Sequence, residues 1–349
     1  MSEAKLTIGM PAGSLANPHR GGNLVTLLDN AGFKTKGYES GGPTHFQTVN
    51  FMYGWDGRPQ EFGSQMQLGE LDVSIAGDDW IKERLTELKI EYGIDAELLK
   101  VLSLKRGGVR IVGIADADDP ADTTEEILKR LTSEKKLITV VSEMPYIAVD
   151  WLRTKLEAMG KLSEFNSWSV QKYKTPPKND SGIVVYETWG KTEAKVKNGG
   201  ADLGLEITQS GSALRNYGLK IIEEIMKSET GIWINPAVKK DPVKLDLLRM
   251  LLLNLHGTIN AEDRVMLLFN VPAEKKERIE SYLAEYNLYA DEPTINPGES
   301  FAQYSIQVET VNPDIPLAKI RYELIKHGAR SVDTVPLLSS ISDIGVLNV

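Results

Sequence analysis

Residues 202–214 read DLGLEITQSGSAL, and this stretch indicates the fold class. Its first half is apolar enough for a buried strand, and the hydroxyl and glycine residues that follow form a turn into a helix. A strand, a glycine turn and a helix start in succession are typical of α/β proteins. Two acidic residues, Asp202 and Glu206, lie on this apolar strand, where packing alone does not require a carboxylate.

The same pattern occurs nearer the N-terminus. Residues 6–10 read as a strand followed by a Pro-Ala-Gly-Ser turn, and residues 71–75 read as a second strand. Gly77, Asp78 and Asp79 follow that second strand as a turn and helix N-cap. Two such units predict a mostly parallel sheet.

Further units follow along the chain. Residues 137–142 form a strand, and Pro145 opens a helix. The acidic segment 115–126 is expected to be a solvated linker close to a domain boundary. A buried helix is expected from Pro242 to His256, with Gly257 as the residue that ends it.

From Ala261 onward the pattern predicts a strand, a helix, two strands, a helix and a strand. This βαββαβ order points to a small ferredoxin-like domain with both helices on one face of the sheet. The segment holds 14 acidic and 8 basic residues, so it carries −6 of the total charge of −9. We therefore expect anionic substrates to bind in the preceding part of the chain.

The amino-acid composition excludes several classes of function. The chain of 349 residues is 41% hydrophobic and 26% charged, as in ordinary globular proteins, and its net charge of −9 argues against a general binder of nucleic acid or anionic membranes. The absence of cysteine removes disulfides and thiolate chemistry, and the four histidines are too scattered for a metal site. The first residues show no signal-peptide pattern, so we expect a cytoplasmic protein.

The turn after the strand of residues 202–207 has the chemistry of a phosphate cradle. Unpaired N–H groups at a helix start, serine and threonine hydroxyls, and a glycine that permits close approach all favour an anion. Two interpretations stay open from these residues alone: a phosphate site, or a helix cap built from Thr208 and Ser210 with Gly211 as a tight turn.

A resemblance to a known family begins at the same residues. Residues 206–219 resemble the phosphoribosyl-pyrophosphate loop of ATP phosphoribosyltransferase, where an acidic residue precedes Thr-Gly-Thr-Thr-Leu and Asn-Gly-Leu follows. The C-terminal βαββαβ segment is similar to that of the long form of the enzyme. Other segments resemble the family in the same order: 10–15, 69–79, 142–145 and 231–236.

The resemblance implies an architecture. We expect two periplasmic-binding-protein-like α/β lobes around a cleft, followed by a C-terminal ferredoxin-like, ACT-like domain. Catalytic lobe I would comprise residues 1–110 and 228–260. Catalytic lobe II, with the phosphoribosyl-pyrophosphate loop, would comprise residues 111–227, and the regulatory domain residues 261–349.

It also implies an activity. A member of this family joins N1 of the ATP adenine to C1 of phosphoribosyl pyrophosphate and releases pyrophosphate, with Mg²⁺ as cofactor, in the first step of histidine biosynthesis. Glu206 would be the catalytic residue and a magnesium ligand, with Asp202 in support. The residues expected to bind the substrates are Thr208, Gln209, Ser210, Gly211, Ser212, Ala213, Gly13, Ser14, Gly77, Asp78, Asp79, Arg110 and Glu193.

Some of these assignments have a simpler alternative. Glu193 could be an ordinary exposed helix residue, and residues 77–79 could do no more than cap a helix. The resemblance further implies feedback inhibition by histidine and a homo-oligomer, either a hexamer or a dimer. No nucleic-acid or membrane partner is expected.

The chain departs from the family at its cationic positions. The family's N-terminal turn reads Pro-Lys-Gly-Arg-Leu, whereas this chain has Ala12 and Ser14 at the two basic positions, and its Gly-Arg-Cys-Arg strand keeps only Arg110. Two further hypotheses therefore stand beside the first: a diverged phosphoribosyltransferase with a less charged acceptor, or a non-catalytic small-molecule-binding protein. The cations that could replace the lost pair are Arg20, Arg58, Arg106 and Lys191.

Overall fold

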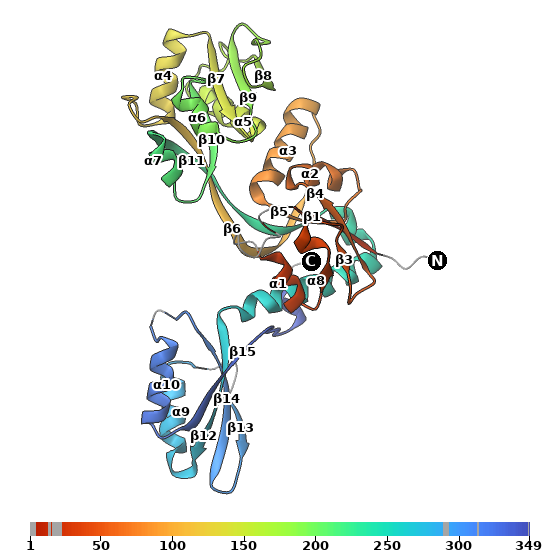
Figure 1. The fold of residues 1–349 in the computed structure, drawn as a ribbon, viewed down its shortest axis with the longest axis vertical. Helices are drawn as coiled ribbons and strands as arrows, with labels where there is room; N and C mark the ends of the chain where they lie inside the picture. The colour runs from red at the N-terminus through yellow and green to blue at the C-terminus, as the bar shows by residue number, and fades with distance from the viewer. Residues whose placement is uncertain (1–4, 13–14, 16–22, 289–292, 313, 348) are drawn as a thin grey trace. The chain divides into compact units, whose positions relative to one another are not determined.

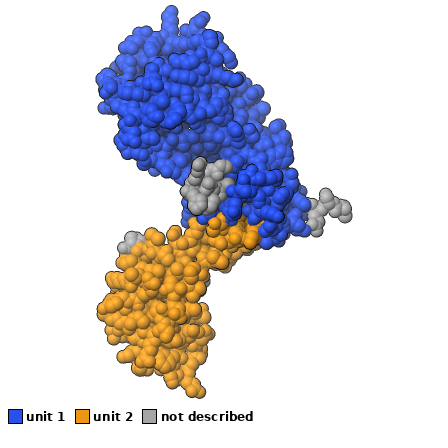
Figure 2. Space-filling view, in the orientation of Figure 1, with its two compact units in different colours: residues 1–25, 35–247, 349 blue, residues 26–34, 248–348 orange. Residues whose placement is uncertain are grey.

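The computed structural model describes residues 5–12, 15, 23–288, 293–312, 314–347 and 349. The chain divides into two compact units, coloured separately in Figure 2. Unit 1 comprises Met1–Val25, Thr35–Leu247 and Val349, and unit 2 comprises Thr26–Lys34 and Leu248–Asn348. Among the described residues, no helix combines the length and hydropathy needed to cross a membrane.

Unit 1 is built on a single sheet that has nine strands within the described residues. Its apolar strands are buried on both sides, as parallel strands covered by helices must be. In spatial order the strands are β4 (Met52–Gly57), β1 (Leu6–Pro11), β5 (Val73–Gly77), β11 (Leu219–Ile234), β6 (Leu99–Asp116), β10 (Leu203–Thr208), β7 (Leu137–Ser142), β9 (Gly182–Glu187) and β8 (Trp168–Lys172).

Two long strands, β6 and β11, run antiparallel through the middle of this sheet and connect its two halves (Figure 1). On one side β4, β1 and β5 pair in parallel, and on the other side β10, β7, β9 and β8 do the same. We call these halves lobe I and lobe II. The expectation of a mostly parallel sheet therefore holds within each lobe, while β6 and β11 pair antiparallel with each other and with β10 and β5 respectively.

Helices cover both lobes. Lobe I carries α2 and α3, and lobe II carries α4 to α7 (Figure 1). Their bounds, with those of a small hairpin and the short 3-10 helices of unit 1, are α2 (Pro59–Gln67), α3 (Asp78–Tyr92), α4 (Thr124–Glu134), α5 (Pro145–Ala158), α6 (Thr192–Lys197), α7 (Ser212–Asn216), β2 (Thr35–Lys36), β3 (His45–Phe46), η3 (Tyr38–Ser40) and η4 (Pro236–Lys240).

The acidic segment 115–126 is a short connection inside lobe II. It joins the end of β6 to α4, and Thr123 begins the helix with a capping box in which its side chain accepts from the Glu126 N–H. Both flanks belong to unit 1, so this segment does not separate the two compact units; it follows β6, the strand that connects lobe I to lobe II.

Unit 2 contains the C-terminal sheet. Its four described strands lie in the order β13-β14-β12-β15 and all pair antiparallel, which is the order expected for a ferredoxin-like βαββαβ unit. The bounds are β12 (Arg264–Pro272), η5 (Ala273–Lys275), α9 (Lys276–Glu285), β13 (Thr294–Pro297), β14 (Phe301–Glu309), α10 (Leu317–Lys326), β15 (Arg330–Pro336) and η6 (Ile344–Val346).

Two helices, α1 (Leu24–Asn30) and α8 (Pro242–Ala261), contribute residues to both units. The prediction that α8 ends at His256 was wrong, because the helix continues to Ala261 and Gly257 lies inside it. Gly257 is buried against the C-terminal segment: a Cβ there would lie 2.4 Å from Ile341 Cγ1 and 2.6 Å from Ser339 Oγ, and its carbonyl accepts the Ser340 N–H at 2.8 Å. The glycine permits close packing and does not cap the helix.

Substitution of Gly257 tests this packing role. We expect Gly257→Val to destabilise unit 2 by about 1–3 kcal/mol, the usual cost of forcing extra atoms into a packed contact. Met250→Val, at a half-exposed position of the same helix, controls for placing a β-branched residue in a helix. Urea denaturation followed by circular dichroism measures both, and equal stability of the two variants would contradict the packing argument.

Candidate active site

The serine- and glycine-rich loop lies at the end of β10 and is exposed. Thr208, the last residue of β10, accepts the Gly211 N–H on its Oγ1 at 3.0 Å, which closes the loop into a tight bend. Gly211 has a φ of 72°, a conformation that glycine adopts without strain. The hydroxyls of Ser210 and Ser212 lie 2.9 Å apart on the exposed side. The loop therefore presents the Ser210 and Ser212 hydroxyls to solvent, while the first N–H of α7, that of Ser212, donates to Ser210 Oγ at 3.3 Å.

Arg110 lies next to this loop. It pairs with Thr208 in the register of β6 and β10. Its Nε donates to the Gln209 carbonyl at 3.3 Å, and its Nη1 forms an ion pair with Glu224 Oε2 at 3.2 Å. A guanidinium held at the edge of a hydroxyl-rich loop suits a phosphate group.

Glu206 lies in an acidic and largely buried environment. Its pKa is raised to about 7, first because burial disfavours the charged carboxylate and then because Glu193 and Glu143 are close. Glu143 also has a raised pKa, caused mainly by burial. Three segments far apart in sequence thus bring Glu143, Glu193 and Glu206 together. Of the predicted residues, Glu193 and Glu206 are neighbours.

The structure does not bring Asp202 to this group. Asp202 precedes the first residue of β10, so at the rise of a strand it lies about 13 Å from Glu206 along the chain. Its carboxylate accepts the Thr139 N–H at 2.9 Å and the Thr139 hydroxyl at 2.8 Å, and it pairs with Lys135. These contacts attach β10 to β7, so the carboxylate of Asp202 has partners within the sheet.

Residues 77–79 start α3. Gly77 is the N-cap, and a Cβ on it would lie 2.2 Å from Asp79 Oδ1. Asp79 is buried, which raises its pKa, and its N–H donates to Ser228 Oγ at 3.1 Å. Asp78 pairs with Lys100 at 2.8 Å. Both carboxylates therefore have partners within the folded structure, and neither side chain caps α3 at Gly77.

Two cavities border β6 and β11 between the lobes of unit 1. They have volumes of about 520 and 500 Å³ and share Val109, Gln209 and Ser228. We call them the cleft cavity and the loop cavity. The other residues that line the cleft cavity are Ala12, Leu15, Arg58, Pro59, Gln60, Gly77, Asp79, Trp80, Gly107, Trp189, Ile207 and Thr230; those of the loop cavity are Asp78, Gly108, Arg110, Lys227 and Glu229.

The predicted residues divide among these places. Gly77, Asp79 and Gln209 line the cleft cavity, while Asp78, Arg110 and Gln209 line the loop cavity. Residues 210–213 follow Gln209 directly without lining either cavity, and Glu193 and Glu206 belong with Glu143 to the acidic group. Gly13 and Ser14 lie outside the described residues.

Sequence analysis missed several residues of the cleft cavity, among them Gln60, Trp80 and Trp189. Arg58 was considered only as one of four replacement cations. The signal for Trp189 was available: a tryptophan next to a glycine in the polar sequence Thr188–Lys191 is not explained by a core role. The signal for Trp80 was weaker, since apolar residues are expected in the first turn of α3.

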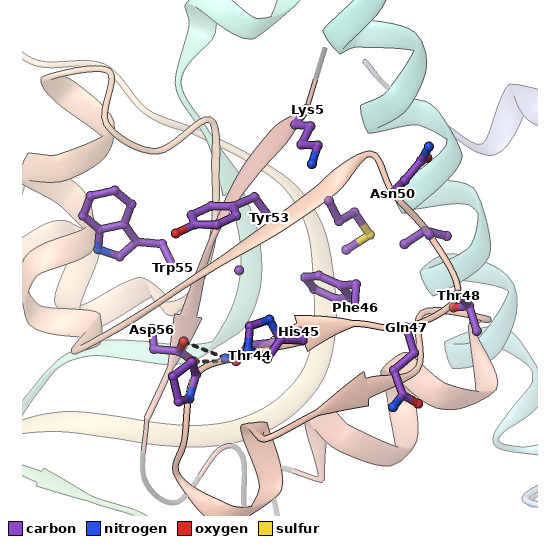
Figure 3. A pocket seen from close by; sticks show the side chains of 14 residues that line it. Lys5, Thr44, His45, Phe46, Gln47, Thr48, Asn50, Tyr53, Trp55 and Asp56 are labelled. Carbon is purple, nitrogen blue, oxygen red and sulfur yellow. Dashed lines mark hydrogen bonds between the residues drawn. The ribbon is translucent and has the colours of Figure 1, made fainter. Parts of the chain in front are cut away.

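A larger cavity of about 770 Å³ lies elsewhere in lobe I (Figure 3). It is open beside β4, from which Tyr53 and Trp55 project, and Thr44 donates its N–H to Asp56 Oδ2 at 2.8 Å at one end. None of the predicted site residues among those described lines it. Its position on the outer strand of the sheet separates it from the loop and the acidic group.

A magnesium site held by the protein alone has little support. Among the described residues, no group of three or more histidine, aspartate or glutamate side chains is arranged to hold a metal ion. Magnesium in phosphate sites usually keeps one or two carboxylates together with substrate phosphates and water. Glu206 fits the part of such a single carboxylate ligand.

The fold and the site together define a two-lobed α/β protein with a hydroxyl-rich loop beside an interlobe cleft. Comparison with known proteins then gives the family. Residues 58–257 match the family model "HisG: ATP phosphoribosyltransferase", which spans more than half of the chain. The chain belongs to the ATP phosphoribosyltransferase family.

Relatives extend the match over nearly the whole chain. The ATP phosphoribosyltransferase of Trichlorobacter lovleyi is 27% identical over 344 residues, with 95% of this chain and 97% of the relative covered. That of Geotalea uraniireducens is 26% identical over 341 residues, with the same coverage. Among solved structures, the ATP phosphoribosyl transferase (HisG:HisZ) complex from Thermotoga maritima is similar at 15% identity and a TM-score of 0.49, covering 72% of this chain and 98% of that one.

Proposed function

We propose that this protein is an ATP phosphoribosyltransferase that transfers the phosphoribosyl group of phosphoribosyl pyrophosphate to N1 of ATP, the first step of histidine biosynthesis. The bond formed joins adenine N1 to ribose C1, and the bond broken joins that C1 to pyrophosphate, which leaves. The observation that carries the proposal is the exposed loop of residues 208–213 with Glu206 just before it, in a chain that belongs to this family.

Charge explains why these residues suit the reaction. Departure of pyrophosphate leaves positive charge on the ribose and adds negative charge to the leaving group, so donors must face phosphates and oxygen atoms must face the sugar. The exposed hydroxyls of Ser210 and Ser212 suit the 5′-phosphate. Glu206 suits the ribose hydroxyls and the developing positive charge.

Two neighbouring cavities can hold the two substrates. We place phosphoribosyl pyrophosphate at the loop cavity, where Arg110 and Lys227 supply positive charge and the carboxylates of Asp78 and Glu229 are paired with Lys100, and the acceptor in the cleft cavity. They meet along Val109, Gln209 and Ser228. Magnesium would be bound mainly through pyrophosphate oxygens with Glu206 as protein ligand, and when bound it neutralises charge on the phosphates.

Regulation and assembly belong to the same proposal. The βαββαβ segment of unit 2 supports a regulatory domain where histidine acts as feedback inhibitor, by binding one quaternary arrangement better than another. The proposal also includes a homo-oligomer, either a hexamer or a dimer, and a cytoplasmic location. Sedimentation with and without histidine tests the oligomeric state and the effect of histidine on it.

The direct test is pyrophosphate release. Purified protein given ATP, phosphoribosyl pyrophosphate and Mg²⁺ should release pyrophosphate, and omission of any of the three should abolish the release. Absence of release with all three present overturns the proposed acceptor or the proposed activity.

The lining of the cleft cavity also supports an alternative acceptor of the phosphoribosyl group. Ala12 lines the cleft cavity at a position where the family resemblance implies lysine, and Arg58 is the one cationic side chain among the described residues that line it. A less charged acceptor than ATP would suit that lining. If ATP gives no pyrophosphate release, a series of ADP, AMP, adenosine and other nitrogen bases distinguishes a diverged transferase from a non-catalytic binding protein.

A further inference from the structure

Trp189 is a large aromatic side chain left exposed at a cavity. Its exposed fraction is 73%, although burying a tryptophan is among the most favourable contributions that one side chain makes to folding. It lies in the connection between β9 and α6 and lines the cleft cavity together with Trp80 of α3. One tryptophan thus comes from each lobe.

The backbone that carries Trp189 is firmly held. The Thr188 hydroxyl donates to the Gly190 carbonyl at 3.0 Å, and Lys195 Nζ donates to the same carbonyl at 2.5 Å. The Gly190 N–H donates to the Glu143 carboxylate. Because the backbone is already fixed, binding a ligand costs only the freedom of the Trp189 side chain and not the ordering of the loop.

A small third cavity of about 160 Å³ adjoins the cleft cavity and shares Gln60, Trp80 and Trp189 with it. We call it the acidic cavity, because its carboxylates outnumber its cation, Arg84. Its other lining residues are Glu83, Arg84, Glu87, Glu143, Pro145, Tyr146, Val170 and Glu187. We call the part of the cleft cavity next to Gln60, Trp80 and Trp189 its tryptophan end. The carboxylates there repel phosphate and favour a neutral, flat group that carries hydrogen-bond donors.

Gln60 provides a further indication of such a donor. Its Oε1 is buried and has no hydrogen-bond partner among the described residues, which is costly for an amide oxygen. An amino group on a bound ring can satisfy an acceptor at this place. Glu143, in addition, faces Glu206, so the tryptophan end of the cleft is the end close to the proposed ribose site.

We propose that Trp189 is the residue that selects the acceptor, by stacking on its adenine ring at the tryptophan end of the cleft cavity. This inference rests on the proposed function, since it assigns the acceptor's orientation within that site. The ring lies against Trp189, its 6-amino group faces Gln60 and the carboxylates, and its phosphates point away from the acidic cavity. Purines with a 6-oxo group, which offer an acceptor where the site needs a donor, bind less well.

The experiment measures acceptor binding and turnover in Trp189→Ala, Trp189→Phe and a matched control, Trp55→Ala. Trp55 is 39% exposed on β4 and lines the separate lobe I cavity. Calorimetry with ATP alone gives the binding constant, and pyrophosphate release gives KM for each substrate. Circular dichroism checks that all three variants are folded.

We expect Trp189→Ala to weaken ATP binding and raise its KM roughly 10- to 100-fold, the range expected for loss of one base–aromatic stack, with the KM of phosphoribosyl pyrophosphate unchanged. Trp189→Phe should recover most of the loss, Trp55→Ala should behave as wild type, and ITP should bind wild type at least about tenfold more weakly than ATP.

Other results separate the two proposals. Trp189-dependent binding of ATP without pyrophosphate release would overturn the proposed activity and retain the inference. Normal release in Trp189→Ala, with an unchanged ATP KM, would overturn the inference and retain the activity. Equal affinity for ATP and ITP would overturn the orientation assigned to the ring.

Discussion

Replacing Glu206 with glutamine is expected to lower the turnover number about 100-fold or more while leaving the protein at least as stable as wild type. Glutamine keeps the shape of the side chain but removes the negative charge that, in the proposed function, faces the sugar as positive charge develops there. Loss of one preorganised electrostatic contact of this kind costs about 10²- to 10³-fold in rate. Pyrophosphate release under saturating substrates measures the effect.

The expected stability of Glu206→Gln follows from the pKa of Glu206. The folded-state pKa is about 7, above the ordinary value of 4.5, because the carboxylate is buried and faces Glu193 and Glu143. A raised pKa means that the folded state binds the proton more tightly than the unfolded state. The resulting stabilisation is complete below pH 4.5 and is lost as the pH rises through about 7.

Glu206→Gln removes that pH dependence. Above pH 7 the variant should therefore exceed wild type in free energy of unfolding, by about 1–3 kcal/mol. Urea denaturation at pH 5 and pH 8 measures the difference, with Glu157→Gln, at an exposed position of α5, as the control. A variant with normal turnover would contradict the catalytic role, and one destabilised at pH 8 would show that the charge serves folding.

Much of the fold could be predicted because the local patterns are strong. The strand at residues 6–10, the Gly77 N-cap and the Pro145 helix start each follow from the spacing of apolar residues and a capping or proline signal. The βαββαβ order was predictable for the same reason, since each of its elements has a clear period and a short connection.

Features that depend on distant contacts could not be predicted. Gly257 had the sequence signature of a helix end, but the approach of Ile341 decides its role and leaves the helix intact around it. Asp202 and Glu206 belong to the same apolar stretch of sequence. The register of β10 with β7, however, places Asp202 where its carboxylate accepts the Thr139 N–H.

The acidic group of the candidate site could not be predicted from the sequence either. Glu143 follows β7, Glu193 lies in the first turn of α6 and Glu206 lies on β10, so their proximity arises only when three segments of lobe II pack together. The cleft tryptophans come from two lobes. Sequence motifs located the loop of residues 208–213, whereas its surroundings are a property of the tertiary structure.

A second buried carboxylate connects the lobes directly. Glu83 lies on α3 of lobe I, and its two oxygens accept the N–H groups of Tyr146 at 2.9 Å and Ile147 at 2.8 Å, in the first turn of α5 of lobe II. Burial raises the pKa of Glu83 to about 7, while these two hydrogen bonds and Arg84 oppose the rise. An acceptor at a helix N-terminus also interacts favourably with the helix dipole.

Glu83→Ala should destabilise unit 1 by about 2–4 kcal/mol, because it leaves two N–H groups without a partner in a largely buried contact. Hydrogen exchange at Tyr146 and Ile147 should accelerate in this variant, whereas Glu91→Ala, at an exposed position of the same helix, should leave it unchanged. Glu83→Gln keeps one acceptor oxygen, so at acidic pH its free energy of unfolding should fall by about half as much as that of Glu83→Ala. The Gln variant should also lack the decrease in stability that wild type shows as the pH rises through about 7. That decrease arises because a raised folded-state pKa makes the protonated form the more stable one. Unchanged exchange in Glu83→Ala would mean that solvent replaces the carboxylate, and it would contradict a role for Glu83 in holding the start of α5.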